Sequence, residues 1–232
     1  MRVVIRGAGD LASGVALRLW RAGMDVVLLD VEKPTAIRRT VAFSEAIVHG
    51  KQTVEDVTAR LATAETAEET LAAGYIPVLV DPEGRSVPKL KPDALVDAIL
   101  AKRNLGTEIR DAPVVIGVGP GFTAGVDCHA VVETMRGHSL GRVIREGSAI
   151  PNTGIPGLIG GFAGERVLRA PAAGLFHPLR DIGDAVTEGE ILATVEGKPI
   201  IATLTGTLRG ILPEGTEVFP GMKAGDIDPR CQ

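Results

Sequence analysis

The stretch that decides the fold is VVIRGAGDLASGVALRLWRAGMDVVLLD, which runs from Val3 to Asp30. An apolar run at residues 3–5 predicts a strand, and a glycine-rich loop follows it. Apolar residues then recur at helical spacing as far as Gly23, and residues 25–30 predict a second strand. A strand, a loop, a helix and another strand in this order indicate an α/β fold with a mostly parallel sheet.

The glycine-rich loop carries the pattern G-x-G-x-x-A at Gly7, Gly9 and Ala12. Gly7 permits a tight turn, Gly9 lets the backbone approach a pyrophosphate, and the small Ala12 lets the helix pack close to the sheet. Asp30 closes the second strand, where an acidic residue can bind ribose hydroxyls. We therefore predict a Rossmann-like domain that binds a nucleotide or another phosphate-bearing cofactor. The alternative is that the glycines serve only the packing of the helix on the sheet.

Three charged residues near this loop are predicted to bind the cofactor as well. Asp10 departs from the dinucleotide pattern because its carboxylate would repel a pyrophosphate, so it either caps the helix or helps to hold a cation. Arg38 and Arg39 follow the second strand, where they could meet an anionic ligand at the carboxyl ends of the strands. The alternative for both arginines is a solvated surface position.

Further along the chain, the pattern of a parallel sheet continues. Residues 66–73 predict a short helix, 75–81 a buried strand, 92–103 a helix that begins with proline, and 113–118 a further strand.

That last strand runs into a second glycine loop, and we predict that Gly119, Gly121 and Asp127 bind a cofactor. Cys128, His129 and Glu133 follow and are the candidate catalytic residues, because a thiol, an imidazole and a carboxylate crowd together there. In a strand over residues 130–136 with a turn at 137–141, His129 and Glu133 share a face, and a helix would also bring them together. The alternative is a buried cysteine beside a hydrogen-bonded histidine.

Composition excludes several classes of protein. Aromatic residues make up 3% of the 232 residues and the net charge is −4, which argues against a nucleic-acid partner. No apolar run has the length of a membrane helix, and the N-terminus predicts a strand and not a signal peptide. Two cysteines, Cys128 and Cys231, are too few for a cysteine-built metal site, and no metal ligands are assigned. We expect a cytoplasmic protein.

The C-terminal part of the chain contains an internal repeat. Ala170, Gly174, Gly183, Val186 and Gly189 match Ala202, Gly206, Gly215, Val218 and Gly221 at one constant offset. Two copies of a short-stranded unit predict a small β domain with pseudo-twofold symmetry. The pattern resembles the biotinyl/lipoyl barrel-sandwich hybrid, in which the modified lysine lies at the hairpin between the halves. Lys198 has that place here, although the hairpin is short and we expect no modification.

These segments predict three parts of the chain. Residues 1–146 form a Rossmann-like nucleotide- or cofactor-binding domain, 147–164 a connection rich in glycine and proline, and 165–232 a domain like the barrel-sandwich hybrid.

Several uncommon strings resemble those of the YqeB family of selenium-dependent molybdenum hydroxylase system proteins. They are GAGDLASG at 7–14, PTAIRR at 34–39, GPGF at 119–122, RGHSLGRV at 136–143 and GDIDPR at 225–230. The resemblance covers nearly the whole chain, and the Rossmann-like part is similar to XdhC/CoxF maturation factors. It implies a role in the maturation of a molybdenum hydroxylase, with the apoenzyme as partner, and it assigns no catalytic residue.

Two functional hypotheses follow. The first is an accessory factor that binds a nucleotide or the phosphate-bearing molybdenum cofactor at its glycine loops. The second is an NAD(P)-dependent oxidoreductase, although no hydride-transfer constellation such as Tyr-x-x-x-Lys is present. A scaffold whose β domain docks a partner is a third possibility. The sequence does not decide whether the protein is an enzyme, which ligand it binds or whether it forms a homo-oligomer.

Overall fold

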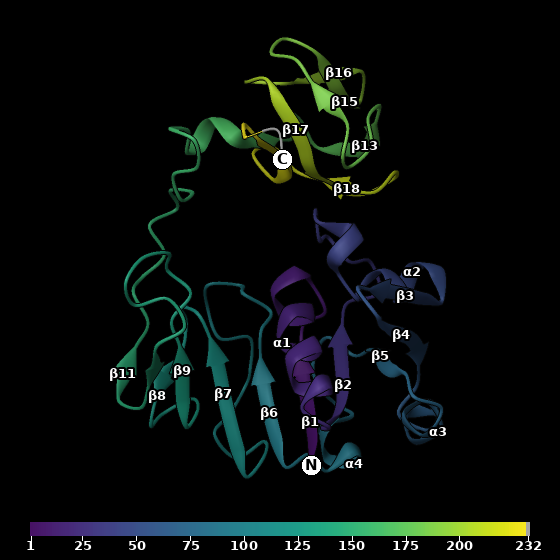
Figure 1. Ribbon diagram of the computed structural model, residues 1–232, viewed down its shortest axis with the longest axis vertical. Coiled ribbons are helices and arrows are strands. Elements are labelled where there is room, and N and C mark those ends of the chain that lie inside the picture. The colour runs from purple at the N-terminus through teal and green to yellow at the C-terminus, as the bar shows by residue number, and fades with distance from the viewer. Residues whose placement is uncertain (231–232) are drawn as a thin grey trace. The chain divides into compact units, whose positions relative to one another are not determined.

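The computed structural model describes residues 1–230 and divides into two compact units (Figure 1). Unit 1 comprises Met1–Pro34 and Val41–Thr153, and unit 2 comprises Thr35–Thr40 and the chain from Gly154 onward. The boundary after Thr153 differs from the one predicted at residue 146, because Gly147 and Ser148 pair with a strand of unit 1. Arg38 and Arg39 lie in unit 2, although their position in the sequence predicts that they belong to the first domain.

Unit 1 is built on one nine-stranded sheet in the order β10-β9-β7-β6-β1-β2-β5-β4-β3 (Figure 1). The seven strands from β9 to β4 run parallel, and the two edge strands are antiparallel to their neighbours. The fold is therefore α/β with a large, mostly parallel sheet, as predicted. The strands are β1 (Arg2–Arg6), β2 (Asp25–Asp30), β3 (Lys51–Val54), β4 (Val57–Ala62), β5 (Ile76–Val80), β6 (Ala94–Asp97), β7 (Val114–Val118), β9 (Ala130–Val132) and β10 (Val143–Ile144). A separate two-stranded sheet joins β8 (Thr123–Ala124) to β11 (Gly147–Ser148).

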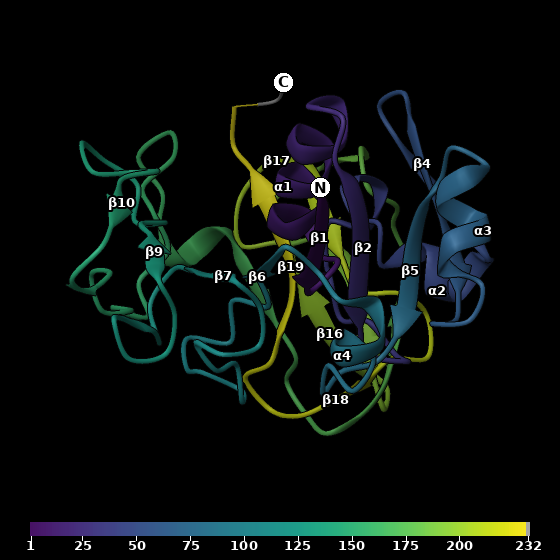
Figure 2. The ribbon, with the colours of Figure 1, turned by 90° about the horizontal axis from the view of Figure 1, so that it is seen from below.

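Helices cover both faces of the large sheet (Figure 2). The helices α1 (Asp10–Arg21) and α2 (Glu45–His49) contribute to the core on one face, with Val3, Ile5 and Leu28 of the sheet. The helices α3 (Ala67–Ala72) and α4 (Val87–Leu90) contribute to the core on the other face, with Val4 and Leu95. A short 3-10 helix, η1 (Arg39–Val41), precedes α2 along the chain.

The predicted helix over residues 92–103 is wrong. The strand β6 occupies Ala94–Asp97 instead and pairs with β1 on one side and β7 on the other. Its four residues are all buried, so the apolar spacing that resembled a helix face belongs to a central strand with both faces covered. The chain then leaves the strand through residues with positive φ, among them Leu100 and Lys102.

The order of strands reverses between β1 and β6, because the chain builds outward from β1 through β2 and later returns to the other side of β1. In open α/β sheets such a switch point, at the carboxyl ends of the strands, is where ligands bind. The loop that contains Gly7 and Gly9 leaves the carboxyl end of β1 at this point.

Unit 2 contains two four-stranded sheets in the orders β12-β19-β17-β14 and β16-β15-β13-β18. Adding 32 residues to a strand of the first repeat gives a strand of the second, as Gly174 at the start of β13 corresponds to Gly206 at the start of β17. When each strand is replaced by its counterpart in the other repeat, the strand order of one sheet becomes the strand order of the other. The strands are β12 (Val167–Arg169), β13 (Gly174–Pro178), β14 (Ala185–Val186), β15 (Ile191–Val195), β16 (Lys198–Ile201), β17 (Gly206–Ile211), β18 (Glu217–Val218) and β19 (Lys223–Asp228), and the 3-10 helix η2 (Gly164–Arg166) precedes them.

Backbone hydrogen bonds repeat with the same symmetry. The N–H of Gly183 donates to the carbonyl of Leu208 at 2.8 Å, and the equivalent N–H of Gly215 donates to the carbonyl of Phe176 at 2.8 Å. Phe176 and Leu208 are both fully buried in the core of unit 2. Each sheet takes strands from both repeats, so neither repeat can form its sheets alone.

The segment Thr35–Thr40 completes unit 2 from a distant part of the sequence. The carbonyl of Ile37 accepts a hydrogen bond of 2.8 Å from the N–H of Ile211 in β17, and its side chain packs against the core of unit 2. None of the helices within residues 1–230 combines the length and the apolar character that a bilayer crossing requires.

Candidate functional site

The N-terminus of α1 is the best candidate for binding an anion. Gly9 is the N-cap residue, with φ of −67° and ψ of −176°, and no side chain caps the helix. A Cβ built on Gly9 would meet no atom of the structure within 4 Å. The first amides of a helix lack partners within the helix, and they carry the positive end of its dipole. Gly9 therefore leaves open space where a phosphate could approach these amides.

Asp30, at the carboxyl end of β2, is held against the same loop. One carboxylate oxygen accepts a hydrogen bond of 2.7 Å from the N–H of Ala8, and the other accepts one of 2.7 Å from the N–H of Val31. Burial raises the pKa of the Asp30 carboxyl, against the lowering effect of these two hydrogen bonds. Asp30 thus orients the glycine loop directly, and each oxygen keeps a further lone pair for a ligand hydroxyl.

Gly7 and Ala12 have packing roles. Gly7 has φ of +98°, and a Cβ there would lie 2.9 Å from the carbonyl oxygen of Ala98. Ala12 is buried in the core between α1 and the sheet. Asp10 is the first residue of α1, where a carboxylate interacts favourably with the helix dipole.

The second predicted glycine loop is filled by the protein itself. A Cβ on Gly119 would lie 2.9 Å from Oγ1 of Thr134, and one on Gly121 would lie 2.7 Å from the backbone of Arg103. Both glycines have positive φ, +82° and +115°. Their geometry is explained by turns that pack closely on neighbouring segments and leaves no space for a ligand at the Cα atoms.

The four reactive residues that follow this loop serve separate structural contacts. Asp127 accepts a hydrogen bond of 2.7 Å from the N–H of Thr123, and Nδ1 of the exposed His129 accepts one of 2.9 Å from the N–H of Val115. Cys128 is fully buried, and burial raises the pKa of its thiol. Cys231 lies outside the described residues.

Glu133 is buried, and both of its carboxylate oxygens are used by the backbone. They accept hydrogen bonds of 2.6 Å from the N–H of Met135 and 2.8 Å from the N–H of Ile150. Burial acts to raise the pKa of Glu133, but these hydrogen bonds outweigh it and the pKa is lowered. Within residues 1–230, no group of three or more His, Cys, Asp and Glu side chains has the arrangement of a metal site.

The structure uses Arg38 and Arg39 to attach their segment to unit 2. Nη2 of Arg38 lies 3.0 Å from a carboxylate oxygen of the buried Asp226, and Nε of Arg39 donates to the carbonyl of Ile211 at 3.0 Å. Neither contact was visible from the sequence, because the partners lie more than 170 residues away, at separations of 188 and 172.

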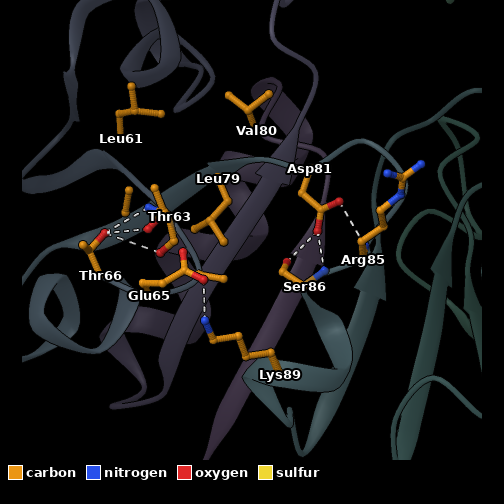
Figure 3. Close-up of a pocket in the computed structure, with 12 residues that line it drawn as sticks. Leu61, Thr63, Glu65, Thr66, Leu79, Val80, Asp81, Arg85, Ser86 and Lys89 are labelled. Carbon is orange, nitrogen blue, oxygen red and sulfur yellow. Dashed lines mark hydrogen bonds and ion pairs between the residues drawn. The ribbon is translucent and has the colours of Figure 1, made fainter.

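A pocket of about 700 Å³ opens at the carboxyl ends of β4 and β5 (Figure 3). Leu61 and Val80 line it and are each more than two-fifths exposed, which is unusual for large apolar residues at the ends of neighbouring strands. Sequence reasoning missed this pocket. The only available signal was the polar run at residues 63–66 directly after a strand.

The charged groups of this pocket already have partners in the protein. Lys89 forms an ion pair with Glu65, which holds the pKa of Glu65 at about 2. Asp81 accepts hydrogen bonds from the N–H groups of Arg85 and Ser86 at 2.9 and 2.7 Å (Figure 3). The hydroxyl of Ser86 also donates to Asp81, at 2.5 Å, so the apolar surface remains as the main feature that a ligand could use.

Lys198 begins β16 directly after the two-residue turn Glu196-Gly197, and it is exposed. Both turn residues have positive φ, as the short hairpin requires. The lysine is placed at the start of a strand and not at the tip of an extended loop.

Fold and site together define a class of protein: an α/β unit with an open helix N-terminus at its switch point, joined to a β unit of two interlocked repeats. Over 229 residues, 98% of its length, the chain is 57% identical to "Uncharacterized protein YqeB" of Escherichia coli (strain K12). This identity supports the YqeB family as the source of the resemblance. The chain spans 42% of that relative's length, and the relative's name assigns no function.

Other comparisons add little. No model of a known protein family matches the chain. Among solved structures, an aspartoacylase family protein from Mesorhizobium loti is 11% identical with a TM-score of 0.27, and the alignment covers 94% of this chain and 62% of that one. A succinylglutamate desuccinylase/aspartoacylase from Rhodobacter sphaeroides is 13% identical with a TM-score of 0.30, over 96% of this chain and 86% of that one. Scores this low carry no argument about function.

Proposed function

We propose that this protein is an accessory factor for a selenium-dependent molybdenum hydroxylase. We further propose that it binds a nucleotide or the phosphate-bearing molybdenum cofactor in unit 1. The phosphate would lie at the N-terminus of α1, beside Gly9. The role in hydroxylase maturation rests on the resemblance to the YqeB family, and the ligand class rests on the geometry of the sheet edge.

The observation that carries the ligand class is the register between β2 and β5. Asp30 is the pairing partner of Val80, so the two side chains lie next to each other on one face of the sheet. This is the face that α1 covers, because Leu28, two residues before Asp30, packs in the same core as Ala12 and Ala16 of α1. Val80 in turn lines the pocket that Leu61 also lines.

The carboxyl edge of the sheet would hold the phosphate at β1, the ribose at β2 and the base in the pocket at β4 and β5, which also takes Leu79 from the core on the other face. Gly9 leaves open space beside the start of α1, Asp30 offers carboxylate lone pairs, and the pocket offers apolar surface and volume for a ring system. A pterin or a nucleobase would fit this description equally. The protein's own groups would bind and orient such a ligand.

We further propose that unit 2 is a barrel-sandwich hybrid. The exchange of strands between its two repeats and the identical order of its two sheets support this assignment. Its role would be to present a surface to the hydroxylase apoenzyme, and not to carry a group on Lys198.

The test of the ligand site is a thermal-shift panel with NAD, NADP, ATP and CTP, followed by the variant Gly9→Val. A ligand that binds only the native state raises the melting temperature, by an amount that grows with ligand concentration over Kd. Because Gly9 has an extended backbone conformation and open space, Gly9→Val should fold normally and lose the shift, since the valine would block the amides.

Gly14→Val is the matched control, because Gly14 lies on the exposed side of the same helix and its Cβ would also meet no atom. It should keep the ligand-induced shift. In a host that makes a molybdenum hydroxylase, Gly14→Val should support hydroxylase activation and Gly9→Val should not. Equal shifts in the two variants would refute the site at α1, and normal activation by Gly9→Val would refute its role in maturation.

The mass of the intact protein tests the role of Lys198. Protein purified from a host that lipoylates and biotinylates its own carriers should have the unmodified mass. An added lipoyl or biotinyl mass would make unit 2 a swinging-arm carrier instead.

A further inference from the structure

A second cavity, of about 310 Å³, lies in unit 1 on the face of the sheet that α4 covers. Arg6, the last residue of β1, lines it together with Val87 and Leu95, which belong to the core on that face. Val4 in β1 packs in the same core, and Arg6 follows it by two residues, so both side chains lie on that face. The cavity is thus separated by the sheet from α1 and from the site proposed there.

The guanidinium of Arg6 is 3% exposed and is almost fully used. Nη1 donates to Oγ1 of Thr107 at 2.6 Å, and Nη2 donates to the carbonyls of Pro82 and Leu105 at 3.1 Å each. Asp97, equally buried, lies 3.7 Å from Nη1 and accepts the hydroxyl of Thr107 at 2.6 Å. The network balances the charge of Arg6 and fixes the orientation of its side chain.

Nε of Arg6 is the one donor that this network leaves out: it is buried and has no hydrogen-bond partner among the described residues. An unmet donor on a buried charged group is costly, and most such groups in proteins have a partner. Gly84, which also lines the cavity, faces this nitrogen. A Cβ on Gly84 would lie 3.7 Å from Nε and 3.5 Å from a methyl group of Val87.

The rim of the cavity supplies an uncommitted positive charge. Arg110 lines it and is exposed, and within the described part of the chain its guanidinium has no ion-pair partner. Of the two acidic residues of the rim, Glu83 pairs with Arg85, and Asp111 accepts the N–H of Glu108 at 2.8 Å. The remaining walls, Val87, Pro88 and Leu95, are apolar.

We infer that this cavity binds a small organic anion, with one oxygen accepting from Nε of Arg6, the charge facing Arg110 and a short apolar body against Val87, Pro88 and Leu95. The fork of Arg110 suits a carboxylate or a phosphate group, and the apolar walls favour a short-chain carboxylate. The inference does not rest on the proposed phosphate site at α1, which lies on the other face of the sheet.

The experiment follows the Nε–H signals of arginine by NMR in the full chain, labelled with ¹⁵N-arginine and titrated separately with butyrate, acetate and inorganic phosphate. The Arg6 signal is identified by its loss in Arg6→Lys. We expect it to shift and saturate with butyrate, and to saturate only at a several-fold higher concentration of acetate. Saturation by phosphate alone would support the site with a different anion. No saturable shift of Arg6 with any of the three probes would overturn it.

Two pairs of variants complete the test. Arg110→Met should weaken butyrate binding about tenfold, the loss expected for one charge-assisted contact, whereas Arg136→Met, an exposed arginine away from the cavity, should not. Gly84→Ala should abolish the shift by covering Nε. Gly74→Ala is its control, because Gly74 has a similar positive φ, +81° against +73°, but no atom near its Cβ position. Equal binding in Gly84→Ala and Gly74→Ala would exclude Nε as the contact.

Discussion

Two glycines of the same motif have opposite requirements. Gly7 needs its missing side chain for the fold, because its φ is +98° and the carbonyl of Ala98 occupies the space. Gly9 has a backbone conformation that any residue adopts, and the space beside it is open. The motif G-x-G-x-x-A predicts both positions, but only the structure separates a packing role from a ligand-binding role.

Gly7→Ala should therefore destabilise the protein, and Gly9→Ala should not. We expect Gly7→Ala to lower the free energy of unfolding by about 2–4 kcal/mol, from backbone strain and the forced displacement of the Ala98 segment. Gly9→Ala should change it by only about 1 kcal/mol, the ordinary advantage of glycine over alanine at an N-cap. Urea unfolding followed by circular dichroism measures both. A loss for Gly9→Ala as large as that for Gly7→Ala would contradict this reading of the loop.

Glu133 gives a prediction about pH. Its pKa is lowered in the folded state, so the unfolded state takes up the proton first as the pH falls. The stability that the carboxylate contributes is present above the ordinary pKa near 4.5 and is lost as the pH falls through the folded value. We expect Glu133→Gln to cost about 2 kcal/mol at pH 7, because one buried N–H loses a charged acceptor.

The same cost should be smaller at pH 3.5, because the carboxyl of the unfolded chain, with its ordinary pKa of 4.5, is by then mostly protonated. Comparing wild type with Glu133→Gln at the two pH values cancels the titration of other groups. If the difference in unfolding free energy between wild type and Glu133→Gln grew on acidification, the pKa of Glu133 would be raised, and not lowered, in the folded state. Glu133→Gln should also leave the ligand-induced thermal shift intact, because this side chain caps backbone amides and does not face the proposed ligand.

At the scale of elements, the sequence predicts β1, α1, β2, α3, β5 and β7 of unit 1 correctly, where periodicity and glycine boundaries place them, but it does not predict α2, β3, β4 or α4. The prediction fails at β6, where four buried residues of a central strand have the same apolar spacing as a helix face. It also places Asp127, Cys128, His129 and Glu133 in one cluster from their proximity in sequence. Their hydrogen-bond partners, such as Val115 and Ile150, are set by tertiary pairing that no local pattern contains.

The repeat in unit 2 permits a prediction on two equivalent elements. A Cβ on Gly174, at the start of β13, would meet the side chain of Glu196, whereas a Cβ on Gly206, at the start of β17, would meet the backbone carbonyl of Asp228. Gly174→Ala should therefore be partly rescued by Glu196→Ala, which removes the obstacle. The strain from its φ of +142° remains.

Gly206→Ala should be rescued by neither Glu196→Ala nor Asp228→Ala, because a backbone atom cannot be truncated. The melting temperatures of the single and double variants test this difference. Rescue of Gly206→Ala by a side-chain truncation would show that the backbone at Asp228 can shift to accommodate the added Cβ.

At the scale of the whole molecule, unit 2 depends on a segment that belongs by sequence to the connection between β2 and α2. Arg38 on this segment is the counterion of Asp226, a fully buried residue whose other carboxylate oxygen has no hydrogen-bond partner among the described residues. The arginine that the sequence places beside a cofactor is a structural residue of the β unit.

Arg38→Met should cost about 3–5 kcal/mol in unit 2, because it leaves the charge of Asp226 buried without a partner. Hydrogen exchange of the amides in β17 and β19 reports this loss separately from unit 1. Arg180→Met, which removes an exposed ion pair with Glu190, is the control and should leave the exchange rates nearly unchanged. Unaltered protection in Arg38→Met would mean that Asp226 is stabilised by other means.

The docked segment Thr35–Thr40 also sets an order of events on the ribosome. Arg39 is translated 172 residues before Ile211, to which it is hydrogen-bonded. At about 5–20 residues per second, its binding site is completed on the order of 10 to 30 seconds after the segment is made. During that interval Ile37 has no apolar partner in unit 2. A chain truncated before β17 keeps this segment undocked permanently, so an incomplete product exposes Ile37 and leaves Arg39 without its partner.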